Sequence, residues 1–579
     1  MFKKNQRHLQ PALISTVQDL PERQREILET SWAGVFYREF HCRIDEGAFA
    51  VMYVDFPSRP NAPVNELVSL EYLKAGNGWT DEEMYEHYLF DVQTRYALGL
   101  DRLGDVNFEL RTVYNFRQRL SKYMQETGIN LLDQAFEQVT DEQIEAYGLK
   151  TGKQRMDSTM IASNIRQMGR LQLLVEVLQR THRMLSEEEQ TQYAEVFEAY
   201  LVGHAGKYIY RLKTEDYAKH LQGIGRVMQY LLAELKQVHG DDPAYQVLER
   251  VFGEHFKVEE AKVQTKEAKE LSTASLQSPD DLEATYREKR GVGYQGYVAN
   301  LTETCDPDNP FQLVTKVQTS PNTTDDSHLL AEALPNLKER TDLEDLYTDG
   351  GFGGPDADLA LQEQKVKLTQ TAIRGRKPDP NKLHLTNFEI EFDQDGQPFK
   401  VTCPHKQTVP VLLTPQKKSF VAHFEPLTCQ SCPFWEKEQC PAQPGKRDTR
   451  HHLRFNMAKA QAADRRRRSQ ACKREAGNLR AAVEATVRSA KHPFPAGKLP
   501  VRGQFRVACM MIGSVALSNV RRIQRYLQAK KRKEKQQNSL SDGVDNSPKS
   551  SGVYFWALAK AALRPLRNFA QPPMLCLDW

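Results

Sequence analysis

Apolar residues in this chain recur at two different spacings, which predict different secondary structures. From residue 162 to about residue 268 they follow one another at intervals of three and four, as in LQLLVEVLQRTHRML and IGRVMQYLLAELKQV. Such intervals place the apolar side chains on one face of a helix. The stretch 162–284 therefore predicts an all-helical subdomain, inserted between segments of different character.

Three further helices are predicted nearer the start of the chain, over residues 65–74, 80–91 and 108–125. Thr80 followed by Glu83 forms a capping box, a pattern typical of a helix start. The third of these helices is basic. The unit is either a helix-turn-helix domain that reads DNA or a helical bundle whose polar face is only solvated.

Shorter apolar runs with strand character surround the helical stretch. Residues 155–161, 294–302, 311–317 and 343–347 predict strands, and residues 326–340 predict a helix between the last two. Strands interrupted by a helix in this order predict an α/β fold with a mixed sheet.

The composition is that of a large water-soluble protein, with 579 residues, of which 40% are hydrophobic and 27% charged. No window reaches the roughly 18 consecutive apolar residues that a membrane span needs. The opening MFKKNQRHLQ lacks the apolar segment of a secretory signal. We therefore expect a cytoplasmic protein with no membrane partner.

The net charge is +3, but basic and acidic residues are distributed unevenly along the chain. Residues 441–540 contain 25 Lys and Arg but only 5 Asp and Glu, so the rest of the chain is acidic. A basic segment of this kind favours a polyanionic partner, most simply nucleic acid. The alternative is a solvated basic tail. Residues 534–552, EKQQNSLSDGVDNSPKSSG, are polar and predict disorder.

Three carboxylates stand out by their surroundings. Asp157 interrupts the apolar strand RMDSTMIA, where a buried charge is costly unless it is compensated. Asp349 follows a short strand and precedes a glycine-rich turn, GGFGG. Glu484 lies in the middle of a predicted basic helix, NLRAAVEATVRSAK. Carboxylates that converge from strand ends and a helix suit Mg²⁺, although each of them alone is more often structural or solvated.

The order and spacing of these residues resemble the DDE transposases of bacterial insertion sequences, whose core is RNase H-like. The most specific element is Arg480, Glu484 and Lys491, which reproduces the family spacing R-(3)-E-(6)-K. The tyrosine that begins this motif in many members is replaced here by Gly477. The run RGQFRV is similar to the closing helix of such transposases, and the helices between residues 66 and 120 are similar to the N-terminal domain of one branch.

The resemblance implies a two-metal mechanism, in which Asp157 bridges both Mg²⁺ (or Mn²⁺) ions while Asp349 and Glu484 hold one each. It implies cleavage of DNA at the ends of the element and strand transfer into target DNA. Arg480 and Lys491, expected on one side of the helix that carries Glu484, would contact DNA phosphates.

The implied partner is double-stranded DNA, both as terminal inverted repeats and as target. It would be bound by a homodimer or a larger assembly associated with the nucleoid. Arg117 in the basic helix and Arg502 in the closing helix are further candidate DNA contacts. Two alternatives remain open, namely an RNase H-like nuclease that cuts without joining and an inactive transposase-derived DNA-binding protein.

Four of the nine cysteines lie close together in the sequence. Cys429 and Cys432 form a CxxC pair, and Cys403 and Cys440 lie on either side of it. This set predicts a structural Zn²⁺ site, in which His405 could replace Cys403. The alternative is four free, reduced thiols.

These patterns together predict an α/β protein with an RNase H-like mixed-sheet catalytic core, a helical N-terminal domain, an all-helical insertion and a Cys-rich insertion. The three acids are separated by 192 and 135 positions, so both gaps must hold inserted subdomains. The predicted division is an N-terminal extension (1–62), a helical DNA-binding domain (63–150), a catalytic core (151–161, 285–375 and 455–530), a helical insertion (162–284), a Cys-rich, zinc-binding insertion (376–454) and a basic, disordered tail (531–579).

Overall fold

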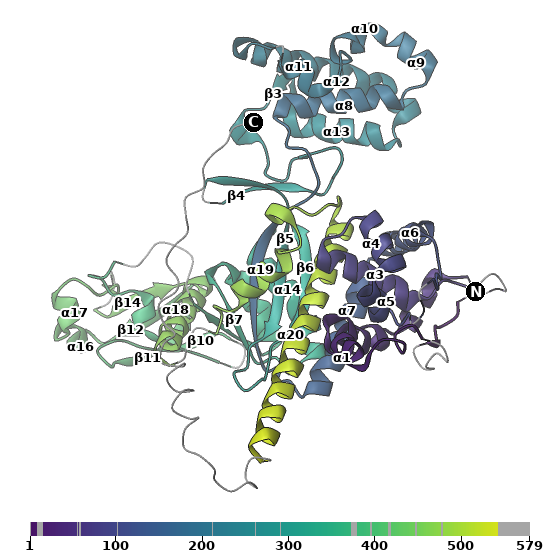
Figure 1. Cartoon of the computed structure of the whole chain (residues 1–579). Helices are drawn as coiled ribbons and strands as arrows, with labels where there is room; N and C mark the ends of the chain where they lie inside the picture. Colours follow the sequence, from purple (N-terminus) through teal and green to yellow (C-terminus); the bar gives the residue numbers. More distant parts are fainter. Residues whose placement is uncertain are drawn as a thin grey trace, which may run out of the picture. The chain divides into compact units, whose positions relative to one another are not determined.

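The computed structural model describes residues between 2 and 541 (Figure 1). Within that span it leaves out residues 8–14, 55, 57–59, 101, 103, 211, 261, 290, 372–378, 394–395, 415–418, 446–448 and 476–478. Gly477 and the last 38 residues of the predicted tail therefore lie outside the described residues. The chain divides into two compact units, Met1–Gln524 and Arg525–Trp579, and each is described by itself.

Among the described residues up to residue 150, the regular elements are helices. Their bounds are α1 (Glu22–Thr30), α2 (Trp32–Glu39), α3 (Val64–Asn77), α4 (Asp81–Phe90), α5 (Val92–Ala97), α6 (Leu110–Thr127) and α7 (Leu131–Tyr147). The predicted capping box is confirmed: the Thr80 hydroxyl accepts from the Glu83 N–H, and the Glu83 carboxylate accepts from the Thr80 N–H. The segment before residue 63 contains α2, and after that helix the buried Phe40 packs edge-on against Tyr72 of α3.

A mixed sheet lies at the centre of the first unit. Its strands are β1 (Lys153–Ala162), β4 (Thr285–Lys289), β5 (Val292–Thr304), β6 (Val314–Pro321), β7 (Asp345–Thr348) and β8 (Lys367–Gln370). The order is β4-β5-β1-β7-β8, and β6 also pairs with β5. Pairing around β5 is antiparallel, whereas β7 runs parallel to both β1 and β8. The predicted α/β class with a mixed sheet is confirmed.

Helices α14 (Asp326–Arg340) and α15 (Pro355–Glu363) contribute to an apolar core with one face of this sheet. Met156 of β1 is buried in that core together with Leu334 and Phe352. Because side chains alternate along a strand, Arg155 and Asp157 point to the opposite face of the sheet. The strand pattern alone thus fixes the face on which Asp157 lies.

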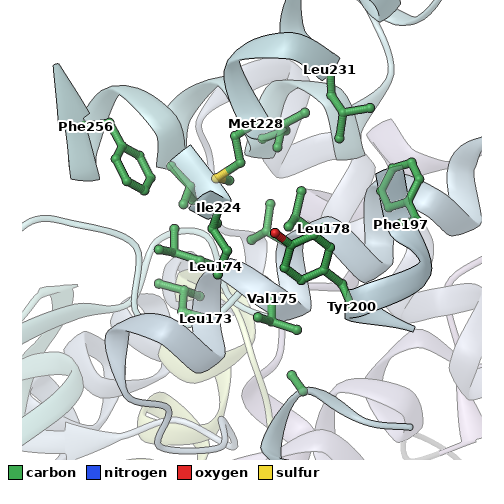
Figure 2. Packing of buried hydrophobic residues seen from close by; sticks show 14 of the residues in the cluster. Leu173, Leu174, Val175, Leu178, Phe197, Tyr200, Ile224, Met228, Leu231 and Phe256 are labelled. Carbon is green, nitrogen blue, oxygen red and sulfur yellow. The ribbon is translucent and has the colours of Figure 1, made fainter. Parts of the chain in front are cut away.

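Between β1 and β4 lies a helical subdomain with its own core. Its helices are α8 (Arg170–Met184), α9 (Glu187–Gln192), α10 (Ala194–Phe197), α11 (Ala205–Tyr210), α12 (Tyr217–His239) and α13 (Pro243–His255). Figure 2 shows Leu174 and Leu178 of α8 packed with Ile224 and Met228 of α12. The prediction of an all-helical insertion is wrong in one respect, since a hairpin of β2 (Phe256–Glu259) and β3 (Lys262–Thr265) follows α13.

The Cys-rich region forms a second, antiparallel sheet. Its elements are β9 (Glu389–Phe392), β10 (Pro398–Thr402), β11 (Thr408–Leu413), β12 (Phe420–Phe424), α16 (Pro426–Gln430), α17 (Pro433–Glu436), β13 (Gln443–Pro444) and β14 (His451–Phe455). The strand order is β13-β14-β12-β11-β10-β9. Phe388, Val401 and Leu453 are buried in its core.

Three helices follow: α18 (Met457–Glu475), α19 (Val483–Lys491) and α20 (Gln504–Ser541). Within the first unit α20 packs closely on α3. The two helices meet at Gly76, where an added Cβ atom would lie only 2.5 Å from the Leu517 Cβ. The disorder predicted for residues 534–552 is wrong for residues 534–541, which continue α20. Among the described residues no helix has both the length and the apolar character that crossing a bilayer requires.

Candidate functional site

Asp157 lies near the middle of β1 and is almost completely buried. One of its carboxylate oxygens accepts a hydrogen bond from the Ser158 N–H and lies 3.1 Å from a guanidinium nitrogen of Arg480. Burial raises the pKa of Asp157, with a smaller contribution from the negative charge of Asp349, while Arg480 opposes the rise. Arg155 lies opposite Tyr347 in the parallel pairing of β1 and β7, and the two predicted aspartates each follow that pair by two positions on neighbouring strands.

Asp349 follows β7 directly and caps the short 3₁₀ turn Gly350–Phe352. Its Oδ1 accepts a hydrogen bond of 2.8 Å from the Gly351 N–H. A Cβ atom at Gly351 would lie 2.6 Å from Asp326 Oδ2 and 3.0 Å from Asp349 Oδ1. A side chain at this position would crowd the Asp326 carboxylate and contact Asp349 tightly, so glycine leaves room for both.

Asp326 brings another carboxylate next to Gly351 and Asp349. It is the first residue of α14, and its Oδ1 accepts a hydrogen bond of 2.7 Å from the Ser158 hydroxyl. This residue was not predicted from the sequence. Its signal was weak, since an aspartate in the first turn of a helix is common for electrostatic reasons alone.

Glu484 is the second residue of α19, not the middle of a helix as predicted. Arg480 precedes the helix and lies in a turn, where the Val483 N–H donates to the Arg480 carbonyl. The prediction that Arg480, Glu484 and Lys491 share one helix is therefore wrong for Arg480. Glu484 is exposed, and its Oε1 lies 3.6 Å from Arg480 Nη1.

The guanidinium of Arg480 thus lies between Asp157 and Glu484. Its charge compensates the buried carboxylate, which explains how β1 tolerates an acid among apolar residues. The three predicted acids provide the oxygen ligands that Mg²⁺ prefers. Within the described part of the chain, however, no group of three or more His, Cys, Asp or Glu side chains is arranged to hold a metal ion.

Two of the basic residues predicted to contact DNA form hydrogen bonds or ion pairs within the protein. Lys491 is half-buried and donates to the Thr159 hydroxyl and to the Met160 carbonyl of β1, and burial lowers its pKa. Arg117 forms ion pairs of 2.7 Å with Glu71 and 2.8 Å with Asp81. Neither side chain is presented to solvent as a free charge.

Arg502 lies in a different environment, on a groove between α6 and the start of α20. Its side chain is exposed, donates to the Asn164 carbonyl and lies 3.3 Å from Asp280. The groove encloses about 740 Å³ and includes Tyr114, Lys122 and Arg506 in its lining. The polar face of the predicted basic helix therefore opens onto this groove.

The four predicted zinc ligands line one small cavity in the Cys-rich region, as does His405. All four are free thiols. Burial raises the pKa of Cys429 to about 11, and the proximity of Cys440, Cys403 and Cys432 contributes to the rise. The fold therefore gathers these cysteines, although the described residues do not form a ready metal site.

One part of the chain is similar to a known protein family. Residues 402–524 match the family model of the transposase DDE domain, which supports a DDE transposase. The match includes Arg480, Glu484 and Lys491 but neither aspartate. No curated protein and no solved structure matches the chain significantly.

Proposed function

We propose that this chain, which carries a transposase DDE domain, is the transposase of a bacterial insertion sequence. It cuts DNA at the ends of the element and joins the freed ends to target DNA. The observation that carries the proposal is the position of Arg480, which contacts Asp157 from β1 and Glu484 from α19. Residues that are far apart in the sequence are brought together there.

An RNase H-like core is the arrangement that fits this sheet best. The antiparallel strands β6, β5 and β1 are followed by the parallel strands β7 and β8. The two aspartates come from neighbouring strands, one within β1 and one directly after β7. These features support the proposal, because side chains from two neighbouring strands can then act together on one substrate.

Asp157, Asp349 and Glu484 are the residues that would hold divalent cations, Mg²⁺ or Mn²⁺. When bound, such cations supply Lewis-acid activation of a phosphodiester and of an attacking hydroxyl. The protein's own contribution is to hold the carboxylates on one face, with Arg480 as their counter-charge and Gly351 leaving room for Asp349. Arg480 is also well placed to exchange a carboxylate partner for a DNA phosphate.

The groove between α6 and α20 is the surface that we assign to double-stranded DNA near its cleaved end. Lys122, Arg502 and Arg506 supply exposed positive charge along it. Cations at such positions strengthen binding by releasing counterions from the phosphates. Joining two ends of an element to one target requires at least two copies of the site, so the active complex is a homodimer or larger.

The decisive experiment uses the full chain and DNA that carries the ends of its own flanking element, with Mg²⁺ or Mn²⁺. We expect Asp157→Asn, Asp349→Asn and Glu484→Gln each to abolish cleavage while DNA binding is retained. Glu332→Gln, on the exposed side of α14, is the matched control and should cut normally. Retained cutting by any of the three variants would remove that residue from the site.

The products separate the alternatives. Joined products establish a transposase, whereas cleavage without joining under the same conditions indicates the RNase H-like nuclease. Specific binding without any cutting, across both metals, indicates an inactive transposase-derived DNA-binding protein.

We also propose a structural Zn²⁺ held by Cys403, Cys429, Cys432 and Cys440. The shared cavity supports it, and binding would draw the four sulfur atoms together. Elemental analysis of the full chain should find about one Zn²⁺ per molecule. The double variant Cys429→Ser/Cys432→Ser should lose it, while Cys305→Ser, outside the region, should keep it. A folded, metal-free wild-type protein would assign the cysteines as free thiols.

A further inference from the structure

Glu303 is a fully buried carboxylate that the proposed mechanism does not use. It lies on β5, directly opposite Arg155 of β1 in the antiparallel register. It accepts hydrogen bonds from Arg155 Nε at 2.6 Å, from the Thr486 hydroxyl at 2.7 Å and from Arg522 Nη1 at 2.7 Å. Three donors from three different elements therefore converge on one side chain.

The donors connect Glu303 to both sides of the candidate site. Arg155 precedes Asp157 by two positions and points to the same face of β1. Its Nη1 also donates to the Leu479 carbonyl at 2.6 Å, one residue before Arg480. The backbone of the turn that carries Arg480 is thereby bonded to the strand that carries Asp157.

A second connection runs through α19 and α20. Thr486 lies two positions after Glu484, and on a helix this spacing directs the two side chains to nearly opposite sides. Thr486 faces Glu303 while Glu484 is exposed. Arg522 of α20 donates to Thr486 as well as to Glu303, so it holds the inner side of α19.

A contribution to stability alone does not explain this arrangement well. Buried ion networks carry a large desolvation cost, and apolar side chains of similar volume often stabilise a fold equally or better. What a directional network adds is geometry, because its hydrogen bonds fix distances and angles. Here the fixed atoms lie within two residues of Asp157, Arg480 and Glu484.

We propose that Glu303 is a positioning residue for the acidic site. By holding Arg155, Thr486 and Arg522 together, it sets the start of α19 against β1, so that Arg480 and Glu484 face Asp157. This inference rests on the proposed function, and it adds a residue outside the DDE motif whose charge determines the geometry of the motif.

The test compares Glu303→Gln with Thr486→Val and Thr486→Ser in the full chain. Glu303→Gln keeps the shape but removes the charge, and Thr486→Val removes one hydroxyl, whereas Thr486→Ser keeps it. We expect the first two to weaken Mn²⁺ binding, measured by electron paramagnetic resonance, and to slow end cleavage about 10–100-fold. The dissociation constant for DNA should stay unchanged, and Thr486→Ser should behave as wild type.

Hydrogen exchange provides a measurement that does not depend on cleavage. In the free protein, both disruptive variants should exchange faster at residues 479–486, with no change in the helices α8 and α12. A residue that only stabilised the fold would lower the melting temperature without a preferential effect on residues 479–486 or on Mn²⁺ affinity. That result, or wild-type cleavage by Glu303→Gln, would overturn the assignment.

The two proposals fail in different ways. If the wild type neither cuts nor joins DNA, the proposed function is wrong, but exchange at residues 479–486 still decides whether Glu303 positions α19. If the wild type cuts and the variants show no local change, only the role of Glu303 is wrong.

Discussion

The burial of Glu66 leads us to predict that the free energy of unfolding depends on pH. This carboxylate lies in the first turn of α3, is 1% exposed and accepts both of its hydrogen bonds from the Asn107 amide, at 2.9 and 2.7 Å. Burial raises its pKa from 4.5 to about 7, although the Asn107 hydrogen bonds oppose the rise. The folded protein thus holds a proton there that the unfolded chain releases at lower pH.

The direction of this pH dependence follows from the linkage between proton binding and folding. A carboxyl group whose pKa is raised on folding contributes fully to stability below pH 4.5, and that contribution is lost as the pH rises through 7. The difference between 4.5 and about 7 corresponds to at most about 3.4 kcal/mol, since each pKa unit is worth 1.36 kcal/mol. Ionisation of Glu66 therefore destabilises the N-terminal helices at neutral pH.

Glu66→Gln removes this titration while it keeps the size of the side chain and an oxygen that can accept from Asn107. Above pH 7 we expect the variant to be more stable than the wild type by about 1–3 kcal/mol, because part of the gain is offset by an imperfectly paired amide. Below pH 4.5 the two proteins should be equally stable, or the variant slightly less.

The assay is urea unfolding of both proteins at several pH values between 4.5 and 8, with the difference in unfolding free energy as the result. Other buried acids, such as Asp133 with a pKa raised by burial to about 7, titrate in both proteins and cancel in that difference. A difference that does not vary with pH would refute the reasoning, because it would show that Glu66 has the same pKa in the folded and unfolded chains.

Four further predictions concern DNA binding and packing. Arg506→Ala should reduce the slope of log affinity against log salt by about 1, measured by fluorescence anisotropy, while the exposed Lys236→Ala on α12 should leave it unchanged. Met228→Ala, in the core of the helical insertion shown in Figure 2, should lower the unfolding free energy by about 2–5 kcal/mol in denaturant titrations. Gly513→Ala should cost about 1–3 kcal/mol, because its Cβ would lie 2.7 Å from the Ala75 Cβ. Gly223→Ala, with nothing within 4 Å, should raise the melting temperature instead.

Local signals predicted the secondary structure wherever they were strong. The helix over residues 326–340 is predicted with its observed bounds, and the capping box at Thr80 forms as expected. Helix α7 was missed, although Asn130 caps its start and Gly148 ends it in the left-handed conformation. The β2–β3 hairpin could not be predicted from helical periodicity, because its two strands span only four residues each.

Tertiary contacts explain what the sequence could not predict about the site. The motif spacing suggested a single helix from Arg480 to Lys491, but the chain turns before Val483 and directs Arg480 toward Asp157, more than 300 positions earlier. Asp326 reaches the site only because the loop between β6 and α14 brings it to the Ser158 hydroxyl. No local pattern carries that information.

One face of β1 provides the contacts that hold Arg480 and α19 in position. Arg155, Asp157 and Thr159 alternate along the strand onto this face, and each contacts the segment between Leu479 and Lys491. Arg155 bonds the carbonyl before Arg480, Asp157 pairs with Arg480 itself, and Thr159 accepts from Lys491 at the far end of α19. The segment from Leu479 to Lys491 thus contacts β1 at three positions along the strand. On this reasoning Lys491 first anchors its helix and holds the geometry of the acids, and a contact with DNA would require it to leave the strand.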